Sequence, residues 1–441
     1  MSRNDEQQRK AKVGTVSELG VEPLGTSDRN GSVSKPLGRV TLFGWLALII
    51  LLIGDAISGE VSASTSISAL ITTTLVVVGL VVLYPTWLFS RKPGMRKCLV
   101  PLLVFLVWSF AVTAIFDHFD KEGVQNLAVY VLFFSTIGVV AFRAQVGSGA
   151  RFTQVLVVVG WIRVVLYGIT LYFEGLNNTA GIYSRRDFAI EALLIMCVVM
   201  TSTDARRRTR WLPYVLAAEI ALSESRTATL LAAVLLIIVA VRGRSGIRAV
   251  ASVLGRIVIV VLIGLWAIEN VPSLHERIFG GNQTALLGVE LNTEGRNVIW
   301  SGVVADAERH NVWVGQGAGS ATDYVRNDEG PVGVEAAEPH DDYLRIWHDF
   351  GYIGIAIWSV AMLKLLRDLW TRGRRTGNRM CYAGVLSLLS ALGLMVTSNV
   401  IVYFFAMLPL GAIIGFALGE PSDQPEAESL SGQSSEPTIL R

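Results

Sequence analysis

Charged residues are scarce in this chain. Asp, Glu, Lys and Arg make up 17% of its 441 residues, whereas a soluble globular domain carries about 25%. The formal net charge is only +2. The chain therefore lacks the basic excess with which proteins bind nucleic acid, and we expect no nucleic-acid partner. The low charge instead favours a protein that lies in a lipid bilayer.

Cysteine is also rare, with three copies in the whole chain: Cys98, Cys197 and Cys381. Each lies within or at the edge of an apolar run, and no two of them have CxxC spacing. The sequence therefore predicts neither a disulfide framework nor a zinc site. We interpret the three residues as thiols buried in the membrane.

Apolar residues are abundant, at 52% of the chain. Runs close to the ~20 residues that an α-helix needs to cross a bilayer recur along the sequence. They predict an all-α, polytopic membrane protein. The expected single spans cover residues 38–53, 68–88, 98–116, 123–142, 152–173, 187–203, 250–268, 343–366, 380–397 and 400–418.

Residues 211–241 form one long apolar segment with basic clusters on both sides. Basic loops stay on the cytoplasmic side of a membrane, so this segment has to cross twice. We predict two short helices, 211–222 and 227–241, that turn at Ser223-Glu-Ser-Arg226 below the membrane surface and hold Arg226 there. With this pair the chain has about twelve spans.

Lys and Arg are shared unevenly between the expected loops. Short loops on one side carry eighteen of these residues and short loops on the other side carry four, which makes the richer side cytoplasmic. Both tails, 1–37 and 419–441, are then cytoplasmic, and their polar composition predicts disorder. Nine spans lie in 38–268 and three in 343–418, and the large loop 269–342 is extracytoplasmic.

The large outer loop contains a pattern typical of an amphipathic helix. Apolar side chains at Ile299, Val303, Val304 and Ala307 share one helical face, which predicts a helix lying on the outer membrane surface. Thr293 is a plausible cap, which places Arg296 in the first turn. Exposed backbone N–H groups there already favour an anion, so Arg296 predicts a phosphate site.

Two further stretches follow in the loop. The first, Gly315-Gln-Gly-Ala-Gly319, predicts a flexible turn. The second, EPHDDYLRIWHDFGYIG at 338–354, gives an otherwise apolar helix a polar entrance. His340 stands just before that helix, as a catalytic base or as its cap. Asp341 and Asp342 favour the first turn through their charge, and either could orient the imidazole, while Gly351 and Gly354 on one face would admit a neighbouring helix.

Four of these stretches together resemble the O-antigen ligase and polymerase family of membrane glycosyltransferases. They are SESRTATL with Arg226, GRNVIW with Arg296, the turn GQGAG, and PHDDYL…DFGYIGI with His340. In the family the histidine is often followed by asparagine or serine, whereas Asp341 follows it here. The departure concerns the acceptor side of the site, so ligase and polymerase both stay open.

The resemblance implies a fold with about a dozen helices and an enzyme of cell-surface polysaccharide synthesis. It would take a glycan from undecaprenyl diphosphate and pass it to a hydroxyl of a glycan, lipid or protein acceptor at the outer side of the cytoplasmic membrane. No metal and no cofactor are implied. Arg226 and Arg296 would bind the diphosphate, and His340 would be catalytic, as a base or as an orienting group.

Other ionisable residues are weaker candidates for substrate contact. Arg185 and Arg186 face outward and would otherwise anchor the helix at the interface. Arg163 falls within an expected span and would otherwise snorkel. Asp341 stands at the entrance of the helix expected at 343–366 and His348 lies two turns into it. A cap for Asp341 and a hydrogen bond to a neighbouring helix for His348 are the alternative explanations.

Two other classes of membrane protein fit less well. A transporter with internal repeats would show paired broken helices in two similar halves, and the sequence has one short pair and no repeat. A peptidoglycan-type glycosyltransferase would depend on an outer-loop carboxylate, whereas the arginine and histidine signals are stronger here.

Overall fold

The computed structural model describes residues 93–174, 185–202, 209–223, 225–241, 283–286, 289–292, 296–326 and 338–420, with the single positions 255 and 269. The spans expected at 38–53 and 68–88 lie outside these residues, as do the span at 250–268 apart from position 255, Thr293 and nearly all of both tails. The prediction of about twelve spans is therefore tested only in part.

The described chain is almost entirely helical. The exception is a short antiparallel hairpin of β1 (Gln283–Leu286) and β2 (Val289–Asn292) in the predicted outer loop. The helices are α4 (Pro93–Ile115), α5 (Lys121–Arg143), α6 (Ser148–Glu174), α7 (Arg185–Thr201), α9 (Leu212–Leu222), α10 (Arg226–Val241), α13 (Arg296–Arg309), α14 (Ser320–Arg326), α15 (Asp342–Thr376), α16 (Arg379–Leu394) and α17 (Phe404–Gly419). Each span expected within the described ranges coincides with a helix.

Four of these helices, α4, α5, α6 and α15, are long and apolar enough to cross a membrane. Helices α7, α9, α10, α16 and α17 are apolar but shorter. The predicted pair at 211–241 is present as α9 and α10. Helix α9 has 11 residues, which span about 16 Å of a hydrocarbon layer about 30 Å thick. The protein is a helical, multi-pass membrane protein.

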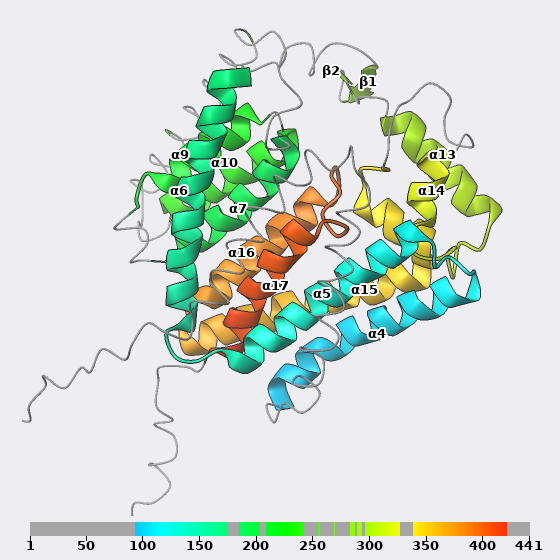
Figure 1. Ribbon diagram of the computed structural model, residues 1–441, viewed down its shortest axis with the longest axis horizontal. Coiled ribbons are helices and arrows are strands. Elements are labelled where there is room, and N and C mark those ends of the chain that lie inside the picture. The colour runs from blue at the N-terminus through cyan, green and yellow to red at the C-terminus, as the bar shows by residue number, and fades with distance from the viewer. Residues whose placement is uncertain are drawn as a thin grey trace, which may run out of the picture. The chain divides into compact units, whose positions relative to one another are not determined.

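Helix α5 lies at the centre of the packing. It is buried along most of its length and packs against α4 and α17 (Figure 1). Glycines of α17 bring the two backbones together: a Cβ atom at Gly419 would lie 2.1 Å from the carbonyl oxygen of Ala141. Because small residues allow this approach, helices can associate closely without relying on large apolar side chains.

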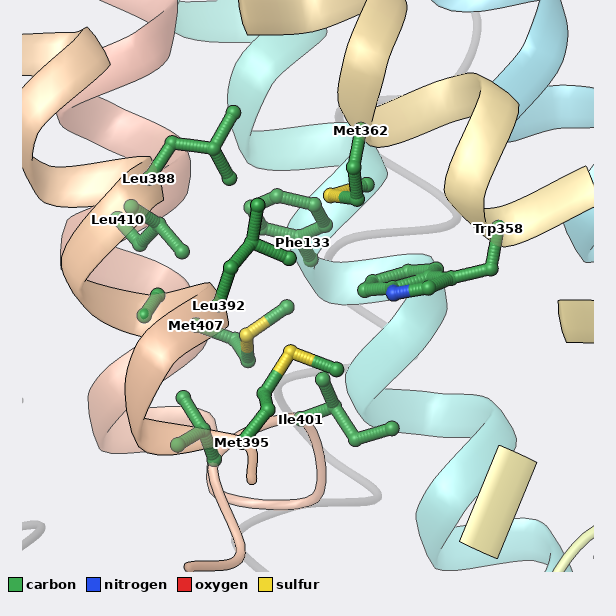
Figure 2. A pocket seen from close by; sticks show the side chains of 11 residues that line it. Phe133, Trp358, Met362, Leu388, Leu392, Met395, Ile401, Met407 and Leu410 are labelled. Carbon is green, nitrogen blue, oxygen red and sulfur yellow. The ribbon is translucent and has the colours of Figure 1, made fainter. Parts of the chain in front are cut away.

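A small apolar pocket lies among α5, α15, α16 and α17. Figure 2 shows Phe133, Trp358 and Met407 around it, together with Met395 and Ile401 from the connection between α16 and α17. This connection, Met395–Tyr403, is called the 395–403 loop below. The 395–403 loop therefore forms part of the wall of an apolar pocket.

Helix α15 is broken at Gly351, where φ is +68° and ψ is −172°. Val312 and Trp313 lie against the break, and their carbonyl groups accept the N–H groups of Tyr352 and Ile353 at 2.9 and 3.2 Å. The prediction that Gly351 and Gly354 share one continuous helical face is wrong, because Gly351 leaves the helical conformation. Gly354 does admit a neighbour, the Trp108 side chain of α4.

Candidate functional site

Arg296 begins α13, as predicted, and reaches the 395–403 loop. Its Nη1 atom donates to the carbonyl oxygen of Thr397 at 3.0 Å. The apolar face of α13, which was expected to contact the membrane surface, is covered by other helices of the chain. Its Ile299 and Val303 pack with Val325 of α14 and Leu344 of α15, because these helices offer an apolar partner within the chain itself.

Arg226 is the first residue of α10, and its side chain is exposed. The next residue, Thr227, places its hydroxyl 2.5 Å from the hydroxyl of Thr397. Thr397 therefore contacts both Arg296 and the chain neighbour of Arg226. The two arginines predicted to bind diphosphate begin two helices that meet at one residue of the 395–403 loop.

His340 also contacts this loop. Its Nδ1 atom lies 3.2 Å from Nδ2 of Asn399, and Asn399 is 2% exposed. The backbone at His340 has φ +53°, a left-handed conformation that costs a residue other than glycine about 1–3 kcal/mol. Trp300 holds the preceding residue, since its Nε1 donates to the carbonyl oxygen of Pro339 at 2.8 Å.

Asp341 is the N-cap of α15. Its Oδ1 accepts from the N–H groups of Tyr343 and Leu344 at 2.9 and 3.0 Å. Burial raises the pKa of this carboxyl group although both hydrogen bonds oppose the shift. Asparagine, serine and aspartate are all strong N-caps. Asp341 can therefore cap α15 in the same way as the asparagine or serine that the family often has at this position.

Asp342 fastens the 395–403 loop to the start of α15. Its carboxylate is fully buried and accepts from the N–H groups of Val400 at 2.5 Å and Ile401 at 3.0 Å. Its own N–H donates to the carbonyl oxygen of Met395 at 2.9 Å. These bonds fix the loop on both sides of Asn399.

Arg345 lies one turn further along α15 and is 1% exposed. It forms an ion pair with Glu338, and its Nη2 donates to Oδ1 of Asn399 at 3.2 Å. Glu338 also pairs with Arg326 of α14 at 3.2 Å. The buried charge of Arg345 is thus compensated, as a buried guanidinium requires.

His348 belongs to a second polar group, behind the first. Its Nε2 lies 2.9 Å from Oδ2 of Asp306, and its Nδ1 lies 3.1 Å from the hydroxyl of Ser320. This order of Ser, His and Asp resembles a nucleophilic triad, but the Ser320 hydroxyl donates to Asp349 at 2.9 Å. Asp306, Ser320 and His348 are all buried residues, so the group faces the interior of the protein.

Asp306 carries the negative charge of this second group. Burial alone would raise the pKa of its carboxyl group. Hydrogen bonds from Gln316 and His348, with the electrostatic influence of His348 and His310, outweigh burial and hold the pKa of Asp306 below its usual value. The group therefore stays ionised and anchors His348 across α13 and α15.

The turn at 315–319 is packed rather than flexible. Gly315, Gly317 and Gly319 have φ of +85°, +108° and +86°. A Cβ atom on Gly315 would lie 2.4 Å from the carbonyl oxygen of Asp349. The Asp349 carboxylate accepts from the N–H groups of Gly319 and Ala321 at 3.0 and 2.9 Å, so the turn is docked on α15 just before the break.

The remaining candidates lie elsewhere. Arg163 of α6 is fully buried, forms an ion pair with Glu191 of α7 and lies 5.4 Å from the ring centre of Phe188. Its guanidinium is not open to a substrate in this structure. Helix α7 begins at Arg185, and the side chains of Arg185 and Arg186 lie outside the described structure.

One group of metal-ligand type occurs among the residues that the structure describes. His118, Asp120 and Asp323 bring one ligand atom each within 4.8 Å of the others. The group joins the α4–α5 connection to α14. Burial, a hydrogen bond to Asp120 and the charges of Asp120 and Glu122 raise the pKa of Asp323 to about 7. The raised pKa means that Asp323 holds its proton at a pH where an ordinary aspartate is ionised, which reduces the repulsion between the two carboxyl groups.

Four residues of the site were not predicted as site residues: Thr397, Asn399, Glu338 and Arg345. Two signals in the sequence were available. Arg345 is a charged residue in an apolar helix, which calls for a partner. Thr397-Ser-Asn399 is a polar interruption between two apolar runs.

The fold and the site define a class: a multi-pass helical membrane protein in which Arg296 and His340 contact one loop and the start of α10, which carries Arg226, meets the same loop. The family model described as O-antigen ligase matches residues 214–359. The match covers Arg226, Arg296 and His340 and confirms the resemblance to the O-antigen ligase family, and it ends before the 395–403 loop. No curated protein matches the chain.

Proposed function

We propose that this protein is a membrane glycosyltransferase of the O-antigen ligase type. It takes a glycan from undecaprenyl diphosphate and transfers it to an acceptor hydroxyl of a glycan, lipid or protein at the outer side of the cytoplasmic membrane. The observation that carries the proposal is the meeting of α10, α13 and the His340 segment at the 395–403 loop.

The chemistry requires a group that stabilises the departing carrier. The acceptor oxygen forms a bond to the anomeric carbon, and the bond from that carbon to the phosphate oxygen breaks with its electron pair. Negative charge then develops on the diphosphate. Arg226 and Arg296 bind it, because a guanidinium stays charged and offers two parallel hydrogen bonds to phosphate. Such fixed charge contributes about 3–4 kcal/mol to lowering a barrier where the bound substrate excludes water.

His340 acts on the acceptor side. It directly precedes the capped start of α15, and its strained backbone is held by Trp300 and by the 395–403 loop. Backbone strain that the surrounding structure maintains is typical of functional residues. No metal takes part, since the two arginines supply the positive charge that a metal would otherwise provide.

A polymerase of carrier-linked repeat units is the second candidate. It uses the same donor and differs only in the acceptor, which is a second carrier-linked unit. Asp341 does not favour one over the other, because its side chain is engaged as the N-cap.

The polysaccharide of a deletion strain tests the proposal. A ligase predicts that finished polymer accumulates on the carrier and is absent from its final acceptor. Products of a single repeat unit would instead identify a polymerase. Unchanged surface and carrier-linked glycans in a strain that normally makes the protein would contradict both.

A further inference from the structure

We propose that Asn399 is a positioning residue that fixes the imidazole of His340 in the tautomer with its proton on Nε2. His340 would then act on the substrate as a hydrogen-bond donor rather than as the base that removes the acceptor proton. The inference rests on the proposed function for its role in transfer, but the tautomer itself is independent of it.

The orientation of the Asn399 amide follows from Arg345. A guanidinium has N–H donors and no acceptor, so the atom of Asn399 that lies 3.2 Å from Arg345 Nη2 is the oxygen. The amide nitrogen then lies on the other side, 3.2 Å from Nδ1 of His340. The amide cannot turn over without placing its N–H₂ group against the guanidinium.

The tautomer of His340 follows from the amide. An amide nitrogen only donates, so Nδ1 of His340 has to accept and carries no proton. In a neutral imidazole the single proton is then on Nε2. In catalytic and metal-binding histidines generally, the hydrogen bond made by one ring nitrogen decides whether the other nitrogen carries the proton.

Arg345 is itself held in place, which makes the chain of three residues rigid. It pairs with Glu338 and lies 3.8 Å from the Asp342 carboxylate, and Asp342 binds the backbone on the far side of Asn399. Arg345 is 1% exposed and Asn399 is 2% exposed. The bond between Arg345 and Asn399 is therefore buried, and it holds the amide that faces the partly exposed His340.

Neutral His340 in this tautomer cannot take the proton from the acceptor hydroxyl. The lone pair of Nδ1 is occupied by Asn399, and Nε2 is protonated, so neutral His340 has no nitrogen lone pair for the acceptor hydroxyl. It donates from Nε2 to a substrate oxygen and holds that oxygen in place. The acceptor proton passes to water as the new glycosidic bond forms.

The tautomer is measured by ¹⁵N NMR of the full-length protein with labelled histidine. The chain has five histidines, and His340→Gln assigns the signal. We expect a protonated Nε2 and an unprotonated Nδ1 at neutral pH. In Asn399→Asp the carboxylate can only accept a hydrogen bond, which favours a proton on Nδ1, so the assignment of the two nitrogens should invert or both should become protonated. A protonated Nδ1 in the unaltered protein would overturn the proposal.

Transfer activity gives the second readout. Asn399→Asp should lose at least about tenfold in rate, since a wrong tautomer cost about 10⁴-fold in a serine protease. Asn311→Asp is the matched control: Asn311 Oδ1 accepts from Trp313 and Val314 N–H groups, and a carboxylate keeps both bonds. If Asn399→Asp unfolds, Asn399→Ala replaces it, with loss of the fixed Nδ1 signal expected.

The outcomes separate this proposal from the proposed function. The predicted tautomer without transfer from any lipid-diphosphate glycan would contradict the function and leave the positioning role of Asn399 intact. Transfer at full rate in folded Asn399→Asp would contradict the positioning role and leave the enzyme class intact.

Discussion

At the scale of single residues, His340 combines an unfavourable backbone conformation with a proposed role in transfer. Glycine adopts φ near +53° without strain. We expect the free energy of unfolding of His340→Gly to be unchanged or higher by up to about 1 kcal/mol, while transfer is nearly abolished. Circular dichroism melting and a transfer assay measure the two effects. A variant that loses stability but transfers normally would show that His340 is only structural.

The residue scale also shows why the site was only partly predictable. Arg226, Arg296 and His340 could be proposed as site residues because each stands in a short stretch with a recognisable pattern. Their common partners Thr397 and Asn399 could not, because Arg296 and Thr397 are 101 positions apart and His340 and Asn399 are 59 apart. Hydrogen bonds over such separations depend on tertiary packing, which local sequence does not encode.

At the scale of elements, the turn at 315–319 joins the outer segment to α15. Gly315→Ala combines a positive φ with a collision against Asp349, so we expect the free energy of unfolding to fall by more than about 2 kcal/mol. Gly147→Ala is the matched control: φ there is +78°, with no atom within 4 Å of the added Cβ.

The two variants differ in that only Gly315→Ala adds a close contact to the strain of a positive φ. Chemical denaturation measures the free energy of unfolding of each variant. The control should lose only about 1 kcal/mol, the cost of placing a side chain in the left-handed region. Equal losses in the two variants would contradict the packed state of the turn.

A second prediction at this scale concerns Asp323 of α14. Its pKa is about 7 in the folded protein, against 3.8 for an ordinary aspartate. Between these values the folded state holds a proton that the unfolded chain releases, so stability falls as pH rises from about 4 to about 7. Asp323→Asn should flatten this dependence, as measured by thermal unfolding across that pH range. The exposed Glu308→Gln is the control, and an unchanged slope in Asp323→Asn would contradict the assignment.

The helices themselves were predicted closely, and the reason is physical. A membrane helix has to satisfy its backbone hydrogen bonds internally and needs a minimum apolar length. The local run of apolar residues therefore predicts where the helix lies in the sequence. The break at Gly351 and the packing of α13 onto α14 and α15 were not predicted. Both depend on residues distant in sequence. The backbone of Trp313 lies against the break at Gly351, and Val325 packs on the apolar face of α13.

At the scale of the whole molecule, the orientation in the membrane follows from the distribution of Lys and Arg. We expect residues 269–342 outside and both tails inside. In a cysteine-free background, a membrane-impermeant thiol reagent added to intact cells should label Gly288→Cys and not Gly377→Cys, which stands at an exposed position after α15. Labelling of Gly377→Cys alone would place the site on the cytoplasmic side and contradict the proposed reaction.

The central claim is that the cluster of Arg226, Arg296 and His340 around the 395–403 loop transfers a glycan from a lipid diphosphate. The most direct measurement is the release of undecaprenyl diphosphate, with glycan appearing on the acceptor, by the purified full-length protein in lipid nanodiscs. We expect release by the unaltered protein, a loss of about 10²-fold or more in Arg296→Ala, poor rescue by Arg296→Lys, and full activity in Arg309→Ala at the other end of α13. Undiminished release by folded Arg296→Ala would contradict the claim.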